Sequence, residues 1–399
     1  MRASWWLGAV AAATLLLASC SGDPARDQST DASAPPSQTS PADPSATDEH
    51  SPSEPAAREP LRPGERFVEL AMPRPYTPKA PNQGTDDYRC FLLDPRLTED
   101  AYLTGIDVVP GDPQVVHHVI LFRVTPDKVE AAKRVDRRAP GQGWTCFGGS
   151  GLEDQGASLD NAPWLGAWAP GGGERAMAPD IGIPVEAGSM IVMQVHYNLL
   201  AGTGADVSSA RLRLASGTKN LAALETVLLP APVELPCRNG VEGRLCDRET
   251  ALLDVMGRFG MRSGQAVAGL QLLCNGGGRP EPGTMQSCVR RVSEPATVRA
   301  VAGHMHLLGK AIKIEVNPGR RDARTLLDTP VWDFDDQGAQ PLRRPAKLEP
   351  GDELKVTCTH DQGLRDVLPA FEGQPERYVL WGEGTTDEMC LGIVLVTRP

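Results

Sequence analysis

The sequence predicts an all-β fold built as two β-sandwich domains. Short runs rich in Val, Ile and Leu recur along the chain, each bounded by Gly, Pro, Asp or Asn, as in short strands joined by turns. Helical patterns are rare. After the N-terminal segments roughly 335 residues remain, which is more than one hydrophobic core usually holds. Two units of roughly 150 residues would each suit a β-sandwich.

The expected strands cover most of the folded part, and one helix accompanies them. The helical pattern covers 248–259, and Asp247 before it is a suitable N-cap, because its carboxylate can accept from the first free N–H groups. The expected strands are 115–124, 190–200, 210–214, 221–229, 297–301, 311–316, 353–359, 377–381 and 390–397.

The first twenty residues form an export signal. Arg2 gives a positive start, and residues 5–17 are apolar but too few to span a bilayer. The small-residue run that ends at Cys20 is typical of a lipobox, in which Cys20 is lipidated and becomes the first mature residue. The alternative is an ordinary secretory signal with an incidental cysteine. Both export the protein, and the lipobox predicts an extracytoplasmic protein anchored to the bacterial cell membrane.

Residues 21–63 predict a disordered tether. Pro, Ser, Ala, Asp and Thr dominate this segment, so it cannot bury enough apolar surface to offset the entropy of ordering. The division between the two folded domains is expected near residues 216–220. The predicted organisation is a signal peptide at 1–20, a linker at 21–63, an N-terminal β-sandwich at 64–217 and a C-terminal β-sandwich at 218–399.

Charge and cysteine content narrow the possible roles. The formal net charge is −11 and Lys and Arg show no strong clustering, which argues against a nucleic-acid partner. Nine cysteines minus Cys20 leave eight, an even number in an oxidising compartment, so we expect four disulfides. The rival interpretation is that some cysteines bind metal. No CxxC pair occurs, and the spacing of Cys237 and Cys246 is poor for a zinc knuckle.

Histidines in the folded part are concentrated in three settings. On a strand, residues i and i+2 point to the same face, so two histidines at this spacing can converge on one ion. Two adjacent histidines reach one metal only if the strand bends, bulges or ends there. The alternative is that these histidines are packed or hydrogen-bonded pairs. The residues are the adjacent His117 and His118, the single His196, and the spaced pair His304 and His306, while His360 stands alone and is expected to leave metal content unaffected.

Met389 adds a soft ligand to the candidate set. It follows the polar turn at 384–387 and directly precedes Cys390. Thioethers favour Cu(I), whereas imidazole serves copper and zinc alike. Taken alone, Met389 would be core filler. Beside His304 and His306 it is the best candidate for a third ligand, and it points to copper.

The order of these motifs resembles that of the copper type II ascorbate-dependent monooxygenases, the family of peptidylglycine alpha-hydroxylating monooxygenase and dopamine beta-hydroxylase. The resemblance extends over residues 66–396, essentially the whole folded part. The matching stretches are Asp86-Asp87-Tyr88-Arg89-Cys90, Val116-His117-His118, Gln194-Val195-His196-Tyr197, His304-Met305-His306-Leu307-Leu308-Gly309-Lys310 and Asp387-Glu388-Met389-Cys390.

The resemblance implies two jelly-roll-like β-sandwiches that face each other across a solvent-filled cleft, with one copper ion in each domain. Gln194 and Tyr88 are candidates to orient the imidazoles. The implied ligands are His117, His118 and His196 for the first copper, and His304, His306 and Met389 for the second, catalytic one.

The resemblance also implies two of the four disulfides. Cys358 would pair with Cys390 and so fix the strand that carries Met389, and Cys90 would pair with Cys146. Sequence alone permits three pairings of the remaining four cysteines. Of these we favour Cys237 with Cys246 and Cys274 with Cys288.

The implied chemistry is hydroxylation of a C–H bond of an unidentified small molecule or peptide. It would use O2, with ascorbate or another one-electron donor as co-substrate. The methionine-containing site would react, and the all-histidine site would supply the second electron. The alternative is an extracytoplasmic copper-binding lipoprotein without hydroxylase activity, because binding alone needs the same ligands. A purely structural role leaves the histidines unexplained.

Three positions depart from the peptidylglycine-hydroxylating enzyme. There, Arg, Asn and Tyr grip a substrate carboxylate, and the matching positions in this chain are Ala302, Leu391 and Ile393. The loss of all three argues against a peptidylglycine substrate and favours a less polar one.

Overall fold

The computed structural model describes residues 59–81, 84–152, 159–169, 172–200 and 202–399. The expected signal peptide, the lipidation residue Cys20 and positions 21–58 of the expected linker lie outside the described residues. All described residues belong to one compact unit, residues 53–399. Glu59 and Pro60, at the end of the expected linker, accept hydrogen bonds from Arg213 through their carbonyl oxygens.

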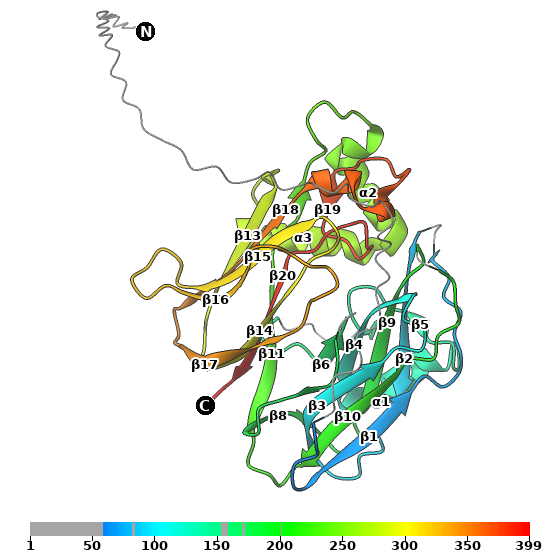
Figure 1. Cartoon of the computed structure of the whole chain (residues 1–399), viewed down its shortest axis with the longest axis vertical. Coiled ribbons are helices and arrows are strands. Elements are labelled where there is room, and N and C mark those ends of the chain that lie inside the picture. The colour runs from blue at the N-terminus through cyan, green and yellow to red at the C-terminus, as the bar shows by residue number, and fades with distance from the viewer. Residues whose placement is uncertain (1–58, 82–83, 153–158, 170–171, 201) are drawn as a thin grey trace, which may run out of the picture. The chain divides into compact units, whose positions relative to one another are not determined.

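Strands dominate, and the chain is all-β, as predicted from the sequence. The longest sheet has nine strands, and eight of them follow one path (Figure 1). In the order of that path they are β1 (Glu65–Ala71), β10 (Ser209–Ser216), β3 (Ala101–Val109), β8 (Ile181–Val185), β11 (Ala222–Pro230), β20 (Leu391–Thr397), β14 (Ala296–His304) and β17 (Gln340–Leu348), with β7 (Arg175–Ala176) paired to β3.

Two smaller sheets accompany the long one, together with a two-stranded ribbon. The five-stranded sheet has the order β5 (Trp144–Thr145), β2 (Asp86–Leu93), β9 (Met190–Asn198), β4 (Val116–Val124) and β6 (Trp164–Trp168). The four-stranded sheet has the order β13 (Met285–Arg291), β18 (Glu353–His360), β15 (Gly309–Val316) and β16 (Arg324–Thr329), and the ribbon pairs β12 (Glu234–Leu235) with β19 (Val379–Leu380).

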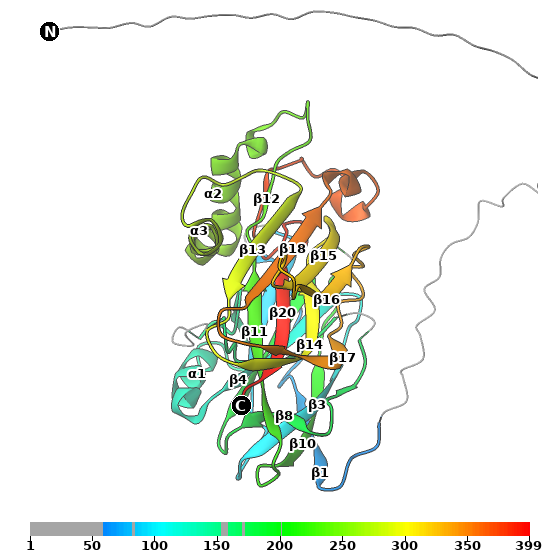
Figure 2. The ribbon, with the colours of Figure 1, turned by 90° about the vertical axis from the view of Figure 1, so that its left-hand side faces the viewer.

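The long sheet contributes residues to two separate hydrophobic cores. In the N-terminal half, Leu103 and Leu214 of the long sheet and Met193 of the five-stranded sheet belong to one core. In the C-terminal half, β11, β14 and β20, which lie side by side in Figure 2, share a second core with the four-stranded sheet. The two halves are joined by a short parallel pairing of β8 with β11. The expected domain boundary between 217 and 218 stays a prediction.

Most of the expected strands are confirmed, with ends shifted by a few residues. The exception is 377–381, where only the two residues of β19 form a strand. Some strands were not predicted because their residues do not alternate clearly. β17 lies at the edge of the long sheet, is mostly exposed and contains two prolines, which an edge strand tolerates.

The expected helix is confirmed as α2 (Arg248–Phe259), and Asp247 caps it by accepting from the Thr250 N–H at 2.9 Å. Two further helices were not predicted, α1 (Val129–Asp136) and α3 (Met261–Asn275). No helix in the described ranges has both the length and the apolar character needed to cross a bilayer. Short 3-10 turns lie at Pro126–Lys128, Arg244–Cys246, Gln362–Asp366 and Pro369–Phe371.

Four disulfides are present in the described part of the chain, and they are the pairs expected above. They join Cys90 to Cys146, Cys237 to Cys246, Cys274 to Cys288, and Cys358 to Cys390.

Candidate metal centre

A β-bulge brings the two adjacent histidines to the same place. Val116 pairs with Tyr197 of β9, but His118 pairs with His196, so β4 has one residue more than its partner strand. The extra residue is His117. A bulge of this kind re-aims a side chain that would otherwise point to the opposite face. This is the irregularity that the sequence requires if His117 and His118 are to reach one ion.

Three imidazole nitrogens converge at this bulge. The Nδ1 atoms of His117, His118 and His196 lie 3.2, 3.2 and 3.3 Å apart, and all three side chains are buried. A ring nitrogen carries either one proton or one lone pair in the ring plane, so the three contacts cannot all be hydrogen bonds. A metal ion bound to nitrogen at about 2.0–2.1 Å places tetrahedral ligands about 3.3 Å apart. The triangle therefore fits three nitrogen ligands of one metal ion.

Asp86 fixes the orientation of His196. Its Oδ1 lies 2.8 Å from His196 Nε2. Because a carboxylate accepts, Nε2 carries the proton and Nδ1 presents its lone pair to the triangle. Burial alone would raise the pKa of Asp86, but the hydrogen bonds from His196 and Thr385 hold this pKa well below its usual range. Asp86 therefore stays ionised and keeps the imidazole in the tautomer that binds metal.

Aromatic rings hold two of the three imidazoles. Tyr88 stacks on His196 with ring centroids 4.0 Å apart, and its hydroxyl donates to the Glu383 carbonyl at 2.7 Å. His117 stacks on Phe334 at 4.4 Å. Burial lowers the pKa of His117 and His118 well below the usual value, so both are neutral and available as ligands.

Of the two residues expected to orient imidazoles, only Tyr88 has a described contact with a histidine. The Gln194 amide donates to the carbonyls of Cys146 and Gly149, at 2.8 and 2.7 Å. It therefore holds the loop after β5 rather than a ring.

The second pair, His304 and His306, lies at the end of β14. β14 ends at His304, so His306 stands in the loop before β15 and not on the strand that its i+2 spacing had suggested. The ring centroids are still only 5.2 Å apart. His304 Nδ1 lies 2.6 Å from the side-chain oxygen Oε1 of Gln337, which accepts, so Nε2 keeps the lone pair. Burial and His306 lower the pKa of His304 to about 3.

Both ring nitrogens of His306 are buried without a hydrogen-bond partner among the described residues. Burial also lowers the pKa of His306. A buried imidazole left unpaired is costly unless a ligand uses it. This unpaired ring beside His304 therefore fits a second metal site.

Glu388 connects His306 to Met389. Its fully buried carboxylate accepts from the N–H groups of His306 at 3.0 Å, Leu308 at 2.5 Å and Met389 at 3.2 Å. His360, expected from the sequence to stand alone, lies 3.4 Å from the same carboxylate and is 1% exposed. One buried carboxylate thus holds the turn of His306 against the segment of Met389.

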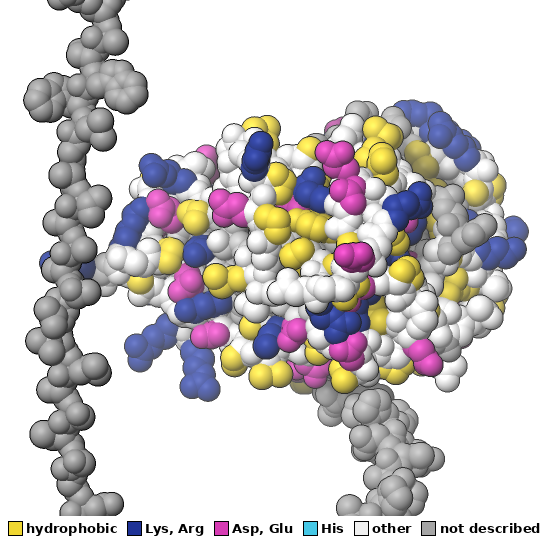
Figure 3. All heavy atoms as spheres, turned by 90° about the horizontal axis from the view of Figure 1, so that it is seen from above, with side chains coloured by type: hydrophobic (Ala, Val, Ile, Leu, Met, Phe, Trp, Pro, Cys, Tyr) yellow, Lys and Arg dark blue, Asp and Glu magenta, His cyan; other side chains and the backbone are white. Residues whose placement is uncertain are grey.

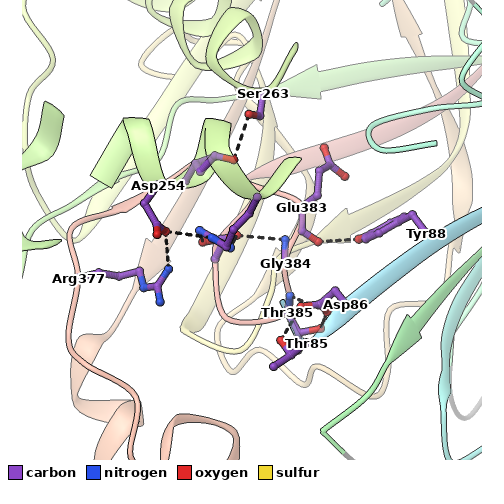
Figure 4. A network of polar contacts seen from close by, with 12 residues as sticks. Thr85, Asp86, Tyr88, Asp254, Ser263, Arg377, Glu383, Gly384 and Thr385 are labelled. Carbon is purple, nitrogen blue, oxygen red and sulfur yellow. Dashed lines mark hydrogen bonds and ion pairs between the residues drawn. The ribbon is translucent and has the colours of Figure 1, made fainter. Parts of the chain in front are cut away.

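The segment before Met389 is held from several sides. Arg258 of α2 makes two hydrogen bonds of 2.7 Å to the Asp387 carboxylate, and the disulfide at Cys390 attaches its end to β18. Thr385 donates to Asp86 through its N–H at 3.1 Å and its hydroxyl at 2.5 Å, in the network of Figure 4. The loop that carries Met389 is therefore fixed to both halves of the molecule.

The two histidine groups lie next to each other. The ring centroids of His118 and His304 are 5.9 Å apart. Both rings, together with Met389, line a cavity of about 1250 Å³ between the two halves. Residues of both halves line this cavity, whereas the two facing domains that the resemblance implies stay a prediction.

Several residues of this centre were not predicted from the sequence. Asp86 lies two positions before Tyr88, so strand alternation puts both on one face, and this was the available signal. Glu388 is adjacent to Met389 in the quoted motif. Gln337 and Glu383 belong to loops whose position depends on tertiary packing, so no sequence pattern could have identified them.

Comparison with known proteins gives one informative match. Residues 285–395 match the family described as copper type II ascorbate-dependent monooxygenase, C-terminal domain. The comparison with curated proteins gives no match.

Solved structures align only loosely with this chain. A fucolectin from striped bass serum is 10% identical, with 79% of this chain and 84% of that one covered and a TM-score of 0.18. An allantoicase is 10% identical, with 74% and 86% covered and a TM-score of 0.19. A xanthan lyase from Paenibacillus is 11% identical, with 82% and 27% covered and a TM-score of 0.18. Superpositions this loose carry no argument about fold or function.

Proposed function

We propose that this chain, whose residues 285–395 carry the C-terminal domain of the copper type II ascorbate-dependent monooxygenases, hydroxylates a C–H bond of its substrate with O2 and ascorbate or another one-electron donor. Two copper ions per chain are proposed. The proposed ligands are His117, His118 and His196 for one ion, and His304, His306 and Met389 for the other.

The triangle of Nδ1 atoms carries this proposal. Its spacing of 3.2 to 3.3 Å suits three ligands of one ion, and Asp86 sets the tautomer of His196. Met389 supports copper over zinc for the second site, since a thioether favours Cu(I). Copper, when bound, supplies the one-electron redox chemistry that activation of O2 requires.

The residues of the chain position these groups and shield them from water. Glu388 holds His306 and Met389 together through their backbone N–H groups. Asp86 holds His196 on one side and the loop before Met389 on the other. Both proposed sites open into one cavity, so a substrate bound there would lie beside Met389.

An extracytoplasmic location with a lipid anchor at Cys20 is part of the proposal. It is supported by the lipobox-like sequence and by the four disulfides, which persist in oxidising compartments. A nucleic-acid partner is not proposed, since the face shown in Figure 3 mixes basic and acidic side chains rather than gathering basic ones.

The test begins with copper content. The full chain is reconstituted with copper in the presence of zinc as competitor, and ascorbate-dependent O2 uptake is then measured. Two coppers per chain that resist zinc are expected, and His117→Ala should lower the content by about one, whereas His50→Ala in the linker should not. One copper or none, or a preference for zinc, would contradict the proposed sites. Two coppers without O2 uptake above that of free copper would instead indicate a copper-binding protein without hydroxylase activity.

A further inference from the structure

The floor of the cavity is an apolar sheet surface that leads away from His304. Strands β11, β20 and β14 lie side by side, and alternate residues of each line the cavity. Pairing across β20 fixes three rows. They are Pro230, Leu391 and His304, then Leu228, Ile393 and Ala302, and then Thr226, Leu395 and Ala300.

These nine positions contain almost no polar groups. Only His304 and Thr226 carry a polar side chain, and His304 stands at the end of the floor that adjoins Met389. Ile393 and Leu395 are only partly buried, because their side chains face the cavity. A substrate lying on this floor would contact mainly hydrocarbon, apart from His304 at one end and the Thr226 hydroxyl at the other.

The opposite wall repeats this arrangement. On β4, His118, Ile120 and Phe122 alternate along the strand and all line the cavity. His118 therefore begins an apolar row as His304 does on the floor. The two rings lie 5.9 Å apart at one end, and at the other Phe122 pairs with Trp164 of β6, two residues after Ala162, which bridges to Thr226 of the floor. The two apolar surfaces therefore extend away from the histidines together.

Charged groups lie mainly at the rim of the cavity. Arg175, Arg262 and Asp336 line it but are exposed, and Arg299 is paired with Asp180 at 2.7 Å. The buried carboxylate of Glu174 also lines it and is paired with Arg213. The volume of about 1250 Å³ exceeds the roughly 300–1,000 Å³ of pockets that hold drug-sized ligands. An apolar interior with a charged rim fits a large apolar ligand that enters from solvent.

Glu383 is the exception near the histidine end. Its carboxyl lines the cavity, and a Cβ added at Gly148 would lie 3.2 Å from its Oε1. Burial raises the pKa of Glu383 to about 7. A substrate carboxylate at this end would meet a second acidic group and no cationic side chain at Ala302, Leu391 or Ile393.

We infer that the substrate of this cavity is a largely apolar molecule, such as a hydrocarbon chain or fused ring system, with no carboxylate at its reacting end. The inference rests on the proposed function, because it names the substrate class of the same cavity. It makes no use of bound metal, since the apolar rows belong to the protein alone.

The test measures binding to the metal-free full chain. The neutral apolar dye N-phenyl-1-naphthylamine is titrated in, and decanol and decanoate then compete for it. Decanol is expected to displace the dye, and decanoate to do so about ten-fold or more weakly, because its charge would be buried without a partner. Absence of saturable dye binding, or decanoate competing as well as decanol, would overturn the inference.

Variants place the binding in this cavity. Ala302→Phe should weaken dye binding by placing a bulky ring on the middle row of the floor, whereas Val331→Phe, at a position 80% exposed and outside the cavity, should not. Glu383→Gln should raise the affinity for decanoate toward that for decanol, because it removes an acidic group. The affinity for decanol should not change. An unchanged dye affinity in folded Ala302→Phe protein would overturn the assignment to this cavity. Because copper is absent throughout, failure of copper binding leaves this result unaffected.

Discussion

The Asp86 carboxylate accepts two hydrogen bonds from Thr385, one from its N–H at 3.1 Å and one from its hydroxyl at 2.5 Å. The same carboxylate also accepts from His196. Asp86 belongs to the N-terminal half, whereas Thr385 lies in the turn that leads to Met389. One buried anion therefore positions groups of both proposed copper sites.

Asp86→Asn should weaken copper binding at the histidine triangle. Asparagine keeps the size but loses the charge that fixes the His196 tautomer, and replacing such a supporting group typically costs about 10- to 100-fold in metal affinity. The measurement is copper affinity by competition with a chelator. Asp87→Asn is the matched control, since the Asp87 carboxylate accepts hydrogen bonds from the Tyr76 hydroxyl and the Lys79 N–H rather than from a histidine. Equal effects of the two variants would argue against this role.

Met389→Ala should abolish ascorbate-dependent O2 uptake while the triangle keeps its copper. Removing the thioether would take away the proposed soft ligand of the second site, which favours Cu(I). Copper content and O2 uptake are measured on the same preparation. Met285→Ala, at a position 66% exposed on β13, controls for loss of a methionine elsewhere. Turnover that persists in Met389→Ala would remove this residue from the ligand set.

His360→Ala should weaken the second site, although the sequence had suggested that this residue is inert. His360 is buried against Glu388, whose carboxylate holds the His306 and Met389 backbone. The change leaves a cavity and lets Glu388 move. Copper content is expected to fall toward one per chain, with the triangle still filled. Two tightly bound coppers in this variant would show that His360 only packs.

Some of this centre could be predicted from the sequence and some could not. The need for an irregularity at His117 and His118 follows from strand geometry alone, and the structure contains the bulge. Strand alternation did not place His306, because β14 ends at His304, two residues before it. The contact between Asp86 and Thr385 joins residues that are distant in the chain, so only the folded arrangement of the two halves reveals it.

The metal-free protein should lose stability as the pH falls below about 6.5. Burial lowers the pKa of His304 to about 3, whereas a histidine in the unfolded chain titrates near its ordinary value of about 6.5. At pH values between these two pKa values, His304 is protonated in the unfolded chain but not in the folded one. Lowering the pH therefore favours unfolding. Near pH 5 this one group should lower the free energy of unfolding by roughly 1–2 kcal/mol.

His304→Gln isolates this contribution, because glutamine does not titrate. Urea unfolding of the metal-free full chain and of the variant is compared at pH 7.5 and pH 5. The loss of stability between the two pH values should be smaller in the variant, while the contributions of other acidic groups cancel in the comparison. The same loss in both proteins would mean that His304 is protonated in the folded chain at pH 5. His304 would then not be the neutral imidazole, able to bind a metal, that its burial and its hydrogen bond to Gln337 imply.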